Sequence, residues 1–134
     1  MLSHLFSLTS VVRNKLAGKG NVFAAFIDFE KAFDCVDREL LFYCLLKNDI
    51  CGKVYRSIKA LYTNTSACVR VNGMFTGWFY TNSGVRQGDS LSPTLFAIFI
   101  NGLAKEIKRT GIGVKLGNSC MSILLYADDI VLMC

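Results

Sequence analysis

Apolar positions recur along the chain with two periods, one typical of amphipathic helices and one typical of short strands. Residues 1–16 place leucine and valine three and four positions apart, which predicts a helix. Residues 22–29 are apolar and aromatic over a short run, which predicts a buried strand. Asp37 stands where it can cap a second helix that runs to about Lys47. A third helix is expected beyond the break at residues 48–52.

The middle of the chain has the pattern of a hairpin followed by a loop. Residues 67–71 and 75–80 are predicted strands, and Asn72-Gly73 between them is a strong signal for a tight hairpin turn. Residues 83–91 are punctuated by glycine, which indicates a loop rather than a continuation of the second strand.

The remaining pattern predicts one more helix and a last pair of strands. Ser92-Pro93 is typical of a helix start, with serine as the cap and proline in the first turn. Apolar side chains then follow at helical spacing as far as Ile107, and residues 123–133 are apolar apart from two aspartates. The order of elements predicts an α+β fold, in which helices pack on one face of an antiparallel sheet.

Composition narrows the class of protein. Hydrophobic residues make up 52% and charged residues 19% of the 134 positions, which predicts one packed domain without long disorder. The six cysteines form no C-x-x-C pair and there is one histidine, so a zinc site and a disulfide framework are not expected. A reducing, intracellular compartment is expected instead. The apolar run that ends at Met133 is short and contains adjacent aspartates, so no membrane span is expected.

The formal net charge is +5, and its distribution is uneven. Residues 53–86 contain five basic residues and no acidic one, whereas acidic residues gather at 28–39 and at 128–129. A basic segment beside acidic foci is typical of a site that holds a phosphate backbone near bound metal ions. A solvated basic face is the alternative interpretation.

Asp128 and Asp129 lie inside an apolar run, where an unpaired carboxylate is costly to bury. A hairpin turn in which backbone amides satisfy both side chains is one interpretation. Asp28 stands in matching surroundings, near the end of the predicted strand 22–29. If the strands are neighbours, three carboxylates meet at one end of a sheet, which calls for magnesium or manganese. Two such ions promote in-line phosphoryl displacement, so metal-assisted phosphoryl transfer is the working hypothesis.

Three motifs at these positions resemble the palm motifs of reverse transcriptases: FIDFEKAFD at 26–34, GVRQGDSLSPTLF at 84–96 and YADD at 126–129. The first two are similar to the LINE-like (non-LTR) branch of that family. The resemblance implies an RNA-directed DNA polymerase, a nucleotidyltransferase of a non-LTR retrotransposon, with a palm-like sheet. Both ends of the chain fall inside predicted elements. We therefore expect a palm fragment over 1–134, truncated at both ends, with part of the fingers–palm junction at 1–21 and without fingers or thumb.

The resemblance also implies which residues hold metal. Asp28 and Asp128 would be the main ligands of two Mg²⁺ ions, with Mn²⁺ as an alternative. Asp129 would complete a catalytic triad of carboxylates, and the backbone carbonyl of Phe29 would assist.

Further positions would bind the incoming dNTP by the same resemblance. Lys31 and Ala32 would offer backbone amides to the triphosphate. Phe33 would lie under the sugar and exclude a 2′-hydroxyl, with an ordinary core phenylalanine as the alternative. Gln87 and Gly88 would contact the nucleotide at the templating pair, where a plain turn is the alternative.

Three more residues have weaker assignments. Arg86 would contact a template or primer phosphate, or be a solvated arginine. Tyr126 would pack near the primer end, or be a tyrosine of the sheet core. Asp34 is expected to cap or to hydrogen-bond locally rather than to act in catalysis.

The implied partners are an RNA template, a DNA primer and dNTP, without a membrane. The implied location is the nucleus and a cytoplasmic ribonucleoprotein. The isolated chain is expected to be weak or inactive. A remnant of a decayed element is a second hypothesis. A non-catalytic nucleic-acid-binding module that uses residues 53–86 is a third, although it leaves Asp28, Asp128 and Asp129 unexplained.

Overall fold

The computed structural model describes residues 2–117 and 119–134. This part of the chain forms two compact units. The first, called the sheet unit, comprises the described residues up to Glu30 together with Ile100–Cys134, and the second, called the hairpin unit, comprises Lys31–Phe99.

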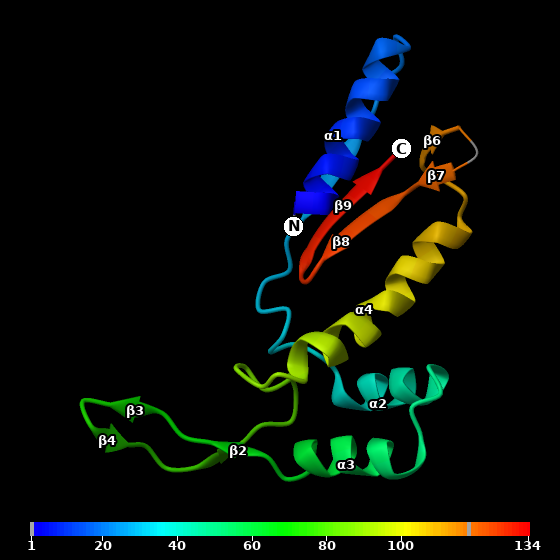
Figure 1. Cartoon of the computed structure of the whole chain (residues 1–134). Helices are drawn as coiled ribbons and strands as arrows, with labels where there is room; N and C mark the ends of the chain where they lie inside the picture. The colour runs from blue at the N-terminus through cyan, green and yellow to red at the C-terminus, as the bar shows by residue number, and fades with distance from the viewer. Residues whose placement is uncertain (1, 118) are drawn as a thin grey trace. The chain divides into compact units, whose positions relative to one another are not determined.

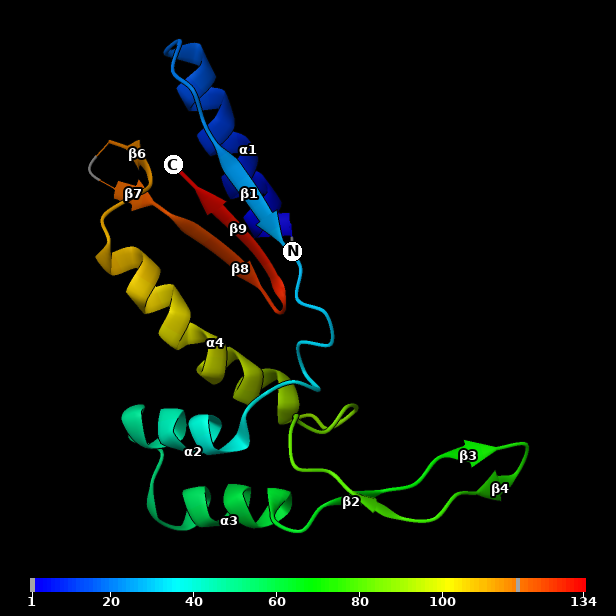
Figure 2. The same ribbon diagram turned by 180° about the vertical axis from the view of Figure 1, so that it is seen from behind.

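The sheet unit is built around three antiparallel strands in the order β1-β9-β8. Figure 1 shows β9 beside β8, and Figure 2 shows all three strands. Strands β8 (Ile123–Tyr126) and β9 (Asp129–Met133) form a hairpin, as the sequence predicts. Strand β1 (Ala24–Ile27) pairs with β9, so that Ile27 lies opposite Ile130. The predicted neighbourhood of the strand before Asp28 and the hairpin that carries the paired aspartates is therefore confirmed.

Helices pack on both faces of this sheet rather than on one (Figure 2). Val11 of α1 (Leu2–Ala17) is buried in a cluster with Met133, against which Leu124 and Val131 pack. The part of α4 (Ser92–Arg109) that belongs to the sheet unit buries Ala104 in another cluster. The sheet residues of that second cluster are Ile123, Leu125, Ile130 and Leu132. Successive strand residues point to opposite faces, and both sets in β8 and β9 are apolar, so each face accepts a helix.

The burial predicted for residues 22–29 is wrong. Strand β1 is shorter than that run and lies at an edge of the sheet, with all four of its residues exposed. Phe26 is 72% exposed. An apolar run is equally compatible with a central strand and with an edge strand, so the pattern alone could not place it.

A small hairpin of β6 (Val114–Leu116) and β7 (Ser119–Met121), absent from the predicted elements, precedes β8. Gly113 stands at its base, where an added Cβ would lie 2.7 Å from the sulfur of Cys120. Val114 is buried in the cluster formed with α1. The hairpin is therefore part of the packed sheet unit.

The hairpin unit contains the two predicted helices, α2 (Arg38–Lys47) and α3 (Gly52–Tyr62). Asp37 caps α2 as predicted, because its carboxylate accepts a hydrogen bond of 2.9 Å from the Leu40 amide. Phe42 of α2 meets Tyr55 of α3 edge to face, with ring centroids 6.3 Å apart. None of the described helices combines the length and the hydropathy of a membrane span.

A narrow ribbon follows α3. Strand β2 (Ser66–Ala67) pairs with β5 (Phe79–Tyr80), and β3 (Arg70–Val71) pairs with β4 (Met74–Phe75). Asn72 and Gly73 both have positive φ, +49° and +84°, as the predicted tight turn requires. The two predicted strands, residues 67–71 and 75–80, are therefore not continuous, because each is interrupted between the β2–β5 pair and the β3–β4 pair.

Candidate active site

Three carboxylates lie at one end of the three-stranded sheet. Asp28 directly follows β1, Asp129 begins β9, and Asp128 stands in the two-residue turn between β8 and β9. The pairing of Ile27 with Ile130 brings Asp28 alongside Asp129 at this end. The aspartates come from opposite ends of the sequence, yet one strand pairing places them together.

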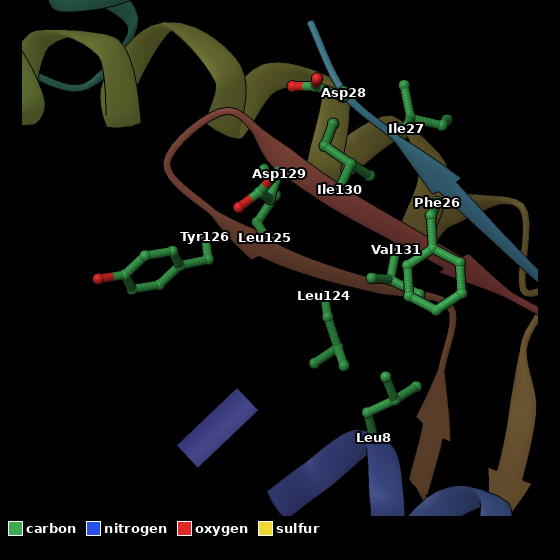
Figure 3. Close-up of a pocket in the computed structure, with 10 residues that line it drawn as sticks. All are labelled: Leu8, Phe26, Ile27, Asp28, Leu124, Leu125, Tyr126, Asp129, Ile130 and Val131. Carbon is green, nitrogen blue, oxygen red and sulfur yellow. The ribbon is translucent and has the colours of Figure 1, made fainter. Parts of the chain in front are cut away.

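Asp28 and Asp129 line the same open pocket, which has a volume of about 400 Å³. In Figure 3 the two aspartates lie toward one end of this pocket, and Leu8, Leu124 and Phe26 lie toward its apolar end. Tyr126, 46% exposed, also lines the pocket at the end of β8. Tyr126 is therefore not a tyrosine of the sheet core, which was the alternative to a position near a primer.

The turn that carries Asp128 has an unusual backbone. Ala127 has φ +52°, a conformation that costs an alanine about 1–2 kcal/mol, and hairpin turns commonly place glycine there. A hairpin turn was one interpretation of the adjacent aspartates, and the turn is present. Among the described residues, however, no amide donates a hydrogen bond to the carboxylate of Asp128 or Asp129. Asp129 is exposed and Asp128 is half-buried, so solvent rather than the turn can satisfy the two charges.

The donor set suits a hard divalent cation, because carboxylate and carbonyl oxygens are the ligands that such ions prefer. In such a site Asp28, Asp128 and Asp129 would supply the carboxylates, and Phe29 would supply a backbone carbonyl next to Asp28. Within the described ranges, no three histidine, cysteine, aspartate or glutamate side chains are grouped closely enough to hold a metal ion. The backbones are thus neighbours, while the side chains do not surround a common point.

The first motif continues into the hairpin unit, where residues 31–35 form a tight turn. Lys31 has φ +52°, and its carbonyl accepts hydrogen bonds from the amides of Asp34 and Cys35 at 2.9 and 3.0 Å. Lys31 is exposed and Ala32 is half-buried. The turn therefore keeps the Lys31-Ala32 backbone near the surface of the hairpin unit.

Phe33 is half-buried and stacks on Phe96 of α4, with ring centroids 4.5 Å apart and an interplanar angle of 25°. Its carbonyl accepts a 2.8 Å hydrogen bond from the Val85 amide. The ring is thus packed on one side and partly open on the other. This position is compatible with a ring that excludes a 2′-hydroxyl and also with an ordinary core phenylalanine.

The loop of the second motif is docked onto the first motif. The Gly84 amide donates a 2.8 Å hydrogen bond to the Val36 carbonyl. Gly84 has φ +81°, and an added Cβ would lie 2.7 Å from the carbonyl oxygen of Asp34. Gly88 has φ +82°, but open space surrounds its α-carbon. Both glycines are needed for their backbone conformation, and Gly84 is also needed for the close approach.

Arg38, which is not among the predicted site residues, connects this loop to α2 and to the end of α3. Its guanidinium donates to the carbonyls of Thr81, Ser83 and Gly84 at 2.6, 2.9 and 2.9 Å, and to the Thr65 hydroxyl at 2.7 Å. Burial lowers the pKa of Arg38. A signal was present, because Arg38 is the first residue of α2 and a cation is unfavourable at the positive end of a helix.

Gln87 and Asp34 are paired in the structure. The Gln87 Nε2 donates to both carboxylate oxygens of Asp34, at 2.9 and 3.1 Å. The two residues are 53 positions apart. The expectation that Asp34 caps or hydrogen-bonds locally is therefore wrong, because the close approach of the two motifs brings a distant partner within reach.

Arg86 lies in the hairpin unit and is engaged there. Its Nη2 donates a 2.7 Å hydrogen bond to the Leu61 carbonyl, and its guanidinium carbon lies 5.9 Å from the centre of the Tyr62 ring. Arg86 remains exposed. Ser92 was expected to cap α4, but it is the first helical residue and its hydroxyl donates to the Arg86 carbonyl at 2.5 Å.

The profile of the family described as "Reverse transcriptase (RNA-dependent DNA polymerase)" matches residues 3–134. The chain is 30% identical over 135 residues to a retrovirus-related Pol polyprotein from a type-1 retrotransposable element R2 of Popillia japonica, covering 99% of this chain and 21% of the relative. The R2 polyprotein of Nasonia vitripennis is 28% identical over 131 residues, covering 98% and 12%. The RNA-directed DNA polymerase from mobile element jockey of Drosophila funebris is 28% identical over 128 residues, covering 96% and 13%.

Proposed function

Since the chain belongs to the reverse transcriptase family, we propose that it carries the nucleotidyl-transfer site of an RNA-directed DNA polymerase from a non-LTR retroelement. The observation that carries the proposal is the pairing of β1 with β9, which brings Asp28 beside the hairpin of Asp128 and Asp129. The chain spans between 12% and 21% of the three relatives described above, so the activity of the longer protein is part of the proposal.

Reverse transcriptases in general use divalent metal ions, and we propose Mg²⁺ here, with Mn²⁺ as an alternative. Asp28, Asp128, Asp129 and the carbonyl of Phe29 would hold two ions. When bound, the ions would lower the pKa of the primer 3′-hydroxyl and stabilise the departing pyrophosphate. The oxygen-only donor set supports this assignment.

The proposed reaction joins the primer 3′-oxygen to the α-phosphate of a dNTP and breaks the bond to the β-phosphate. Phe33 would lie against the sugar and exclude a 2′-hydroxyl, which its half-open ring supports. The backbone amides of Lys31 and Ala32 would contact the triphosphate. Gln87 and Gly88 would contact the nucleotide at the templating pair, and Gly88 has open space beside its backbone.

The proposed partners are an RNA template and a DNA primer. Arg86 would contact one of their phosphates, and Tyr126 would lie near the primer end. We further propose that the protein acts in the nucleus and travels in a cytoplasmic ribonucleoprotein. The template and primer are proposed from the likeness to the RNA-directed DNA polymerase of jockey, whereas the location is proposed from the family resemblance alone.

The test is incorporation of dNTP on an RNA template with a DNA primer, in magnesium or manganese. It compares this chain, the same chain joined to fingers and thumb regions, and the joined protein with Asp128→Asn. Asp49→Asn in the joined protein is the matched control, because it removes the same charge in the turn between α2 and α3.

We expect the joined protein and the Asp49→Asn control to incorporate dNTP, and Asp128→Asn to lower kcat by about 100-fold or more. Little or no incorporation is expected from the chain alone. A folded joined protein that stays inactive in both metals would overturn the proposal and favour a decayed remnant. Equal activity of Asp128→Asn and the control would overturn the assignment of the carboxylates.

A further inference from the structure

The paired side chains of Asp34 and Gln87 have a defined orientation. A carboxylate only accepts hydrogen bonds, so the amide nitrogen of Gln87 must face it, and the reverse orientation would set oxygen against oxygen. The two distances of 2.9 and 3.1 Å place Nε2 between both carboxylate oxygens. The Gln87 Oε1 is therefore the acceptor that this arrangement leaves for another molecule.

The backbones that carry the pair are held independently of it. The Val85 amide donates to the Phe33 carbonyl and the Gly84 amide to the Val36 carbonyl, both at 2.8 Å. Arg38 further holds the loop through the Gly84 carbonyl at 2.9 Å. The two side chains thus extend from segments that are already docked, which is the condition for precise placement of a binding group.

We propose that Asp34 is a positioning residue that fixes the side-chain amide of Gln87, with Oε1 directed to the nucleotide. The inference rests on the proposed function, in which Gln87 contacts the incoming nucleotide at the templating pair. Asp34 itself touches neither the nucleotide nor the reacting atoms. A carboxylate close to a triphosphate site repels the ligand. Asp34 must therefore favour nucleotide binding in some other way that offsets this repulsion.

The benefit is a smaller loss of side-chain freedom when the nucleotide binds. Ordering one flexible side chain in a binding site weakens affinity by roughly 2- to 10-fold. An amide that is held in advance avoids most of this loss. The effect should therefore appear in the KM for dNTP and little in kcat.

Four variants of the joined polymerase test this inference. Asp34→Ala removes the acceptor, and Asp34→Asn keeps a weaker one. Gln87→Glu sets two carboxylates against each other. The double variant D34N/Q87E restores the hydrogen bond with donor and acceptor exchanged, keeps the total charge, and still leaves an acceptor oxygen outward. Asp37→Ala is the control, because Asp37 is a nearby carboxylate that caps α2.

We expect Asp34→Ala to raise the KM for dNTP by roughly 2- to 10-fold, with kcat within about twofold. Asp34→Asn should have a smaller effect. Gln87→Glu should raise KM further, and D34N/Q87E should return it most of the way. Asp37→Ala should lower the unfolding midpoint and leave KM unchanged. In the 134-residue chain, the NMR signals of the Gln87 side-chain amide should shift with Asp34→Ala.

An unchanged KM in Asp34→Ala would overturn the inference, as would a double variant no better than Gln87→Glu. An increase in KM of the same size in Asp37→Ala would also overturn the inference, because loss of local stability alone would then explain the effect. Unshifted amide signals would show that the pair does not form in solution. Failure of the unsubstituted polymerase to incorporate dNTP would instead overturn the proposed function, and the NMR result would still report on the pair.

Discussion

Gly84 and Gly88 form a matched pair within one loop. Their φ angles are +81° and +82°, so alanine is equally unfavourable for the backbone at both positions. Their surroundings differ, because a Cβ at Gly84 would lie 2.7 Å from the Asp34 carbonyl oxygen and 2.9 Å from its α-carbon. At Gly88 the same atom would meet nothing within 4 Å. The two alanine variants therefore separate conformational strain from the close approach of the two motifs.

The expected costs follow from these contacts. A positive φ costs alanine about 1–2 kcal/mol, and the stiffer unfolded chain offsets about 0.4–1 kcal/mol of it. Gly88→Ala should therefore lower the free energy of unfolding by about 1 kcal/mol. In Gly84→Ala the loop must also move away from Asp34. Three hydrogen bonds would be disturbed, those of the Gly84 amide, the Gly84 carbonyl and the Val85 amide. At about 1 kcal/mol each, the total cost should be about 4 kcal/mol.

Urea unfolding of the chain, followed by circular dichroism, measures both variants under the same conditions. If the loop is docked against the Asp34 backbone, the free energies of unfolding of the two variants should differ by about 3 kcal/mol, with similar m-values. Costs that agree within about 1 kcal/mol would refute it, because the loop would then not be docked against the Asp34 backbone. A large loss at Gly88 alone would show that the open space beside that residue is filled in solution.

Three further predictions concern the hairpin unit. Asp37→Ala should lower the free energy of unfolding by about 1 kcal/mol through loss of the helix cap, and no change in the urea midpoint would contradict the cap. Arg38→Lys should cost about 2 kcal/mol in the same assay, because an ammonium cannot reach the separate acceptors that the guanidinium reaches; equal stability would argue against the network. Phe33→Val should raise the ratio of ribonucleotide to deoxynucleotide incorporation about tenfold or more, whereas an unchanged ratio would leave Phe33 a packing role against Phe96.

The sequence predicted those features that depend on local chemistry. Asp37 caps a helix because its own side chain reaches an amide three residues away. Asn72 and Gly73 adopt positive φ because these two residue types tolerate it best. Both outcomes depend on a few adjacent residues, so they could be predicted without any knowledge of distant contacts.

The features that were missed depend on distant contacts. The edge position of β1 is set by which strands pair, and the apolar pattern of residues 22–29 does not contain that information. The partner of Asp34 lies 53 residues away and becomes available only because Gly84 permits a close approach. Neither periodicity nor residue type could have identified that pair.

Residues whose type is unfavourable for their local structure were nevertheless the most useful signal for the candidate site. Aspartates inside apolar strands led to Asp28 and Asp128, and the structure places them at neighbouring strand ends. Arg38 breaks the charge preference of a helix start in the same way, and it holds the loop that precedes Gln87. Ala127 takes a conformation that suits glycine, in the turn that carries Asp128. A residue that violates its local preference is expected at a functional or strained site, where interactions elsewhere offset the cost. At Arg38 the partners are visible in the fold. Asp28 and Asp129 are exposed and Asp128 is half-buried, so water reaches all three carboxylates, and the cation proposed for them is tested by the Asp128→Asn variant.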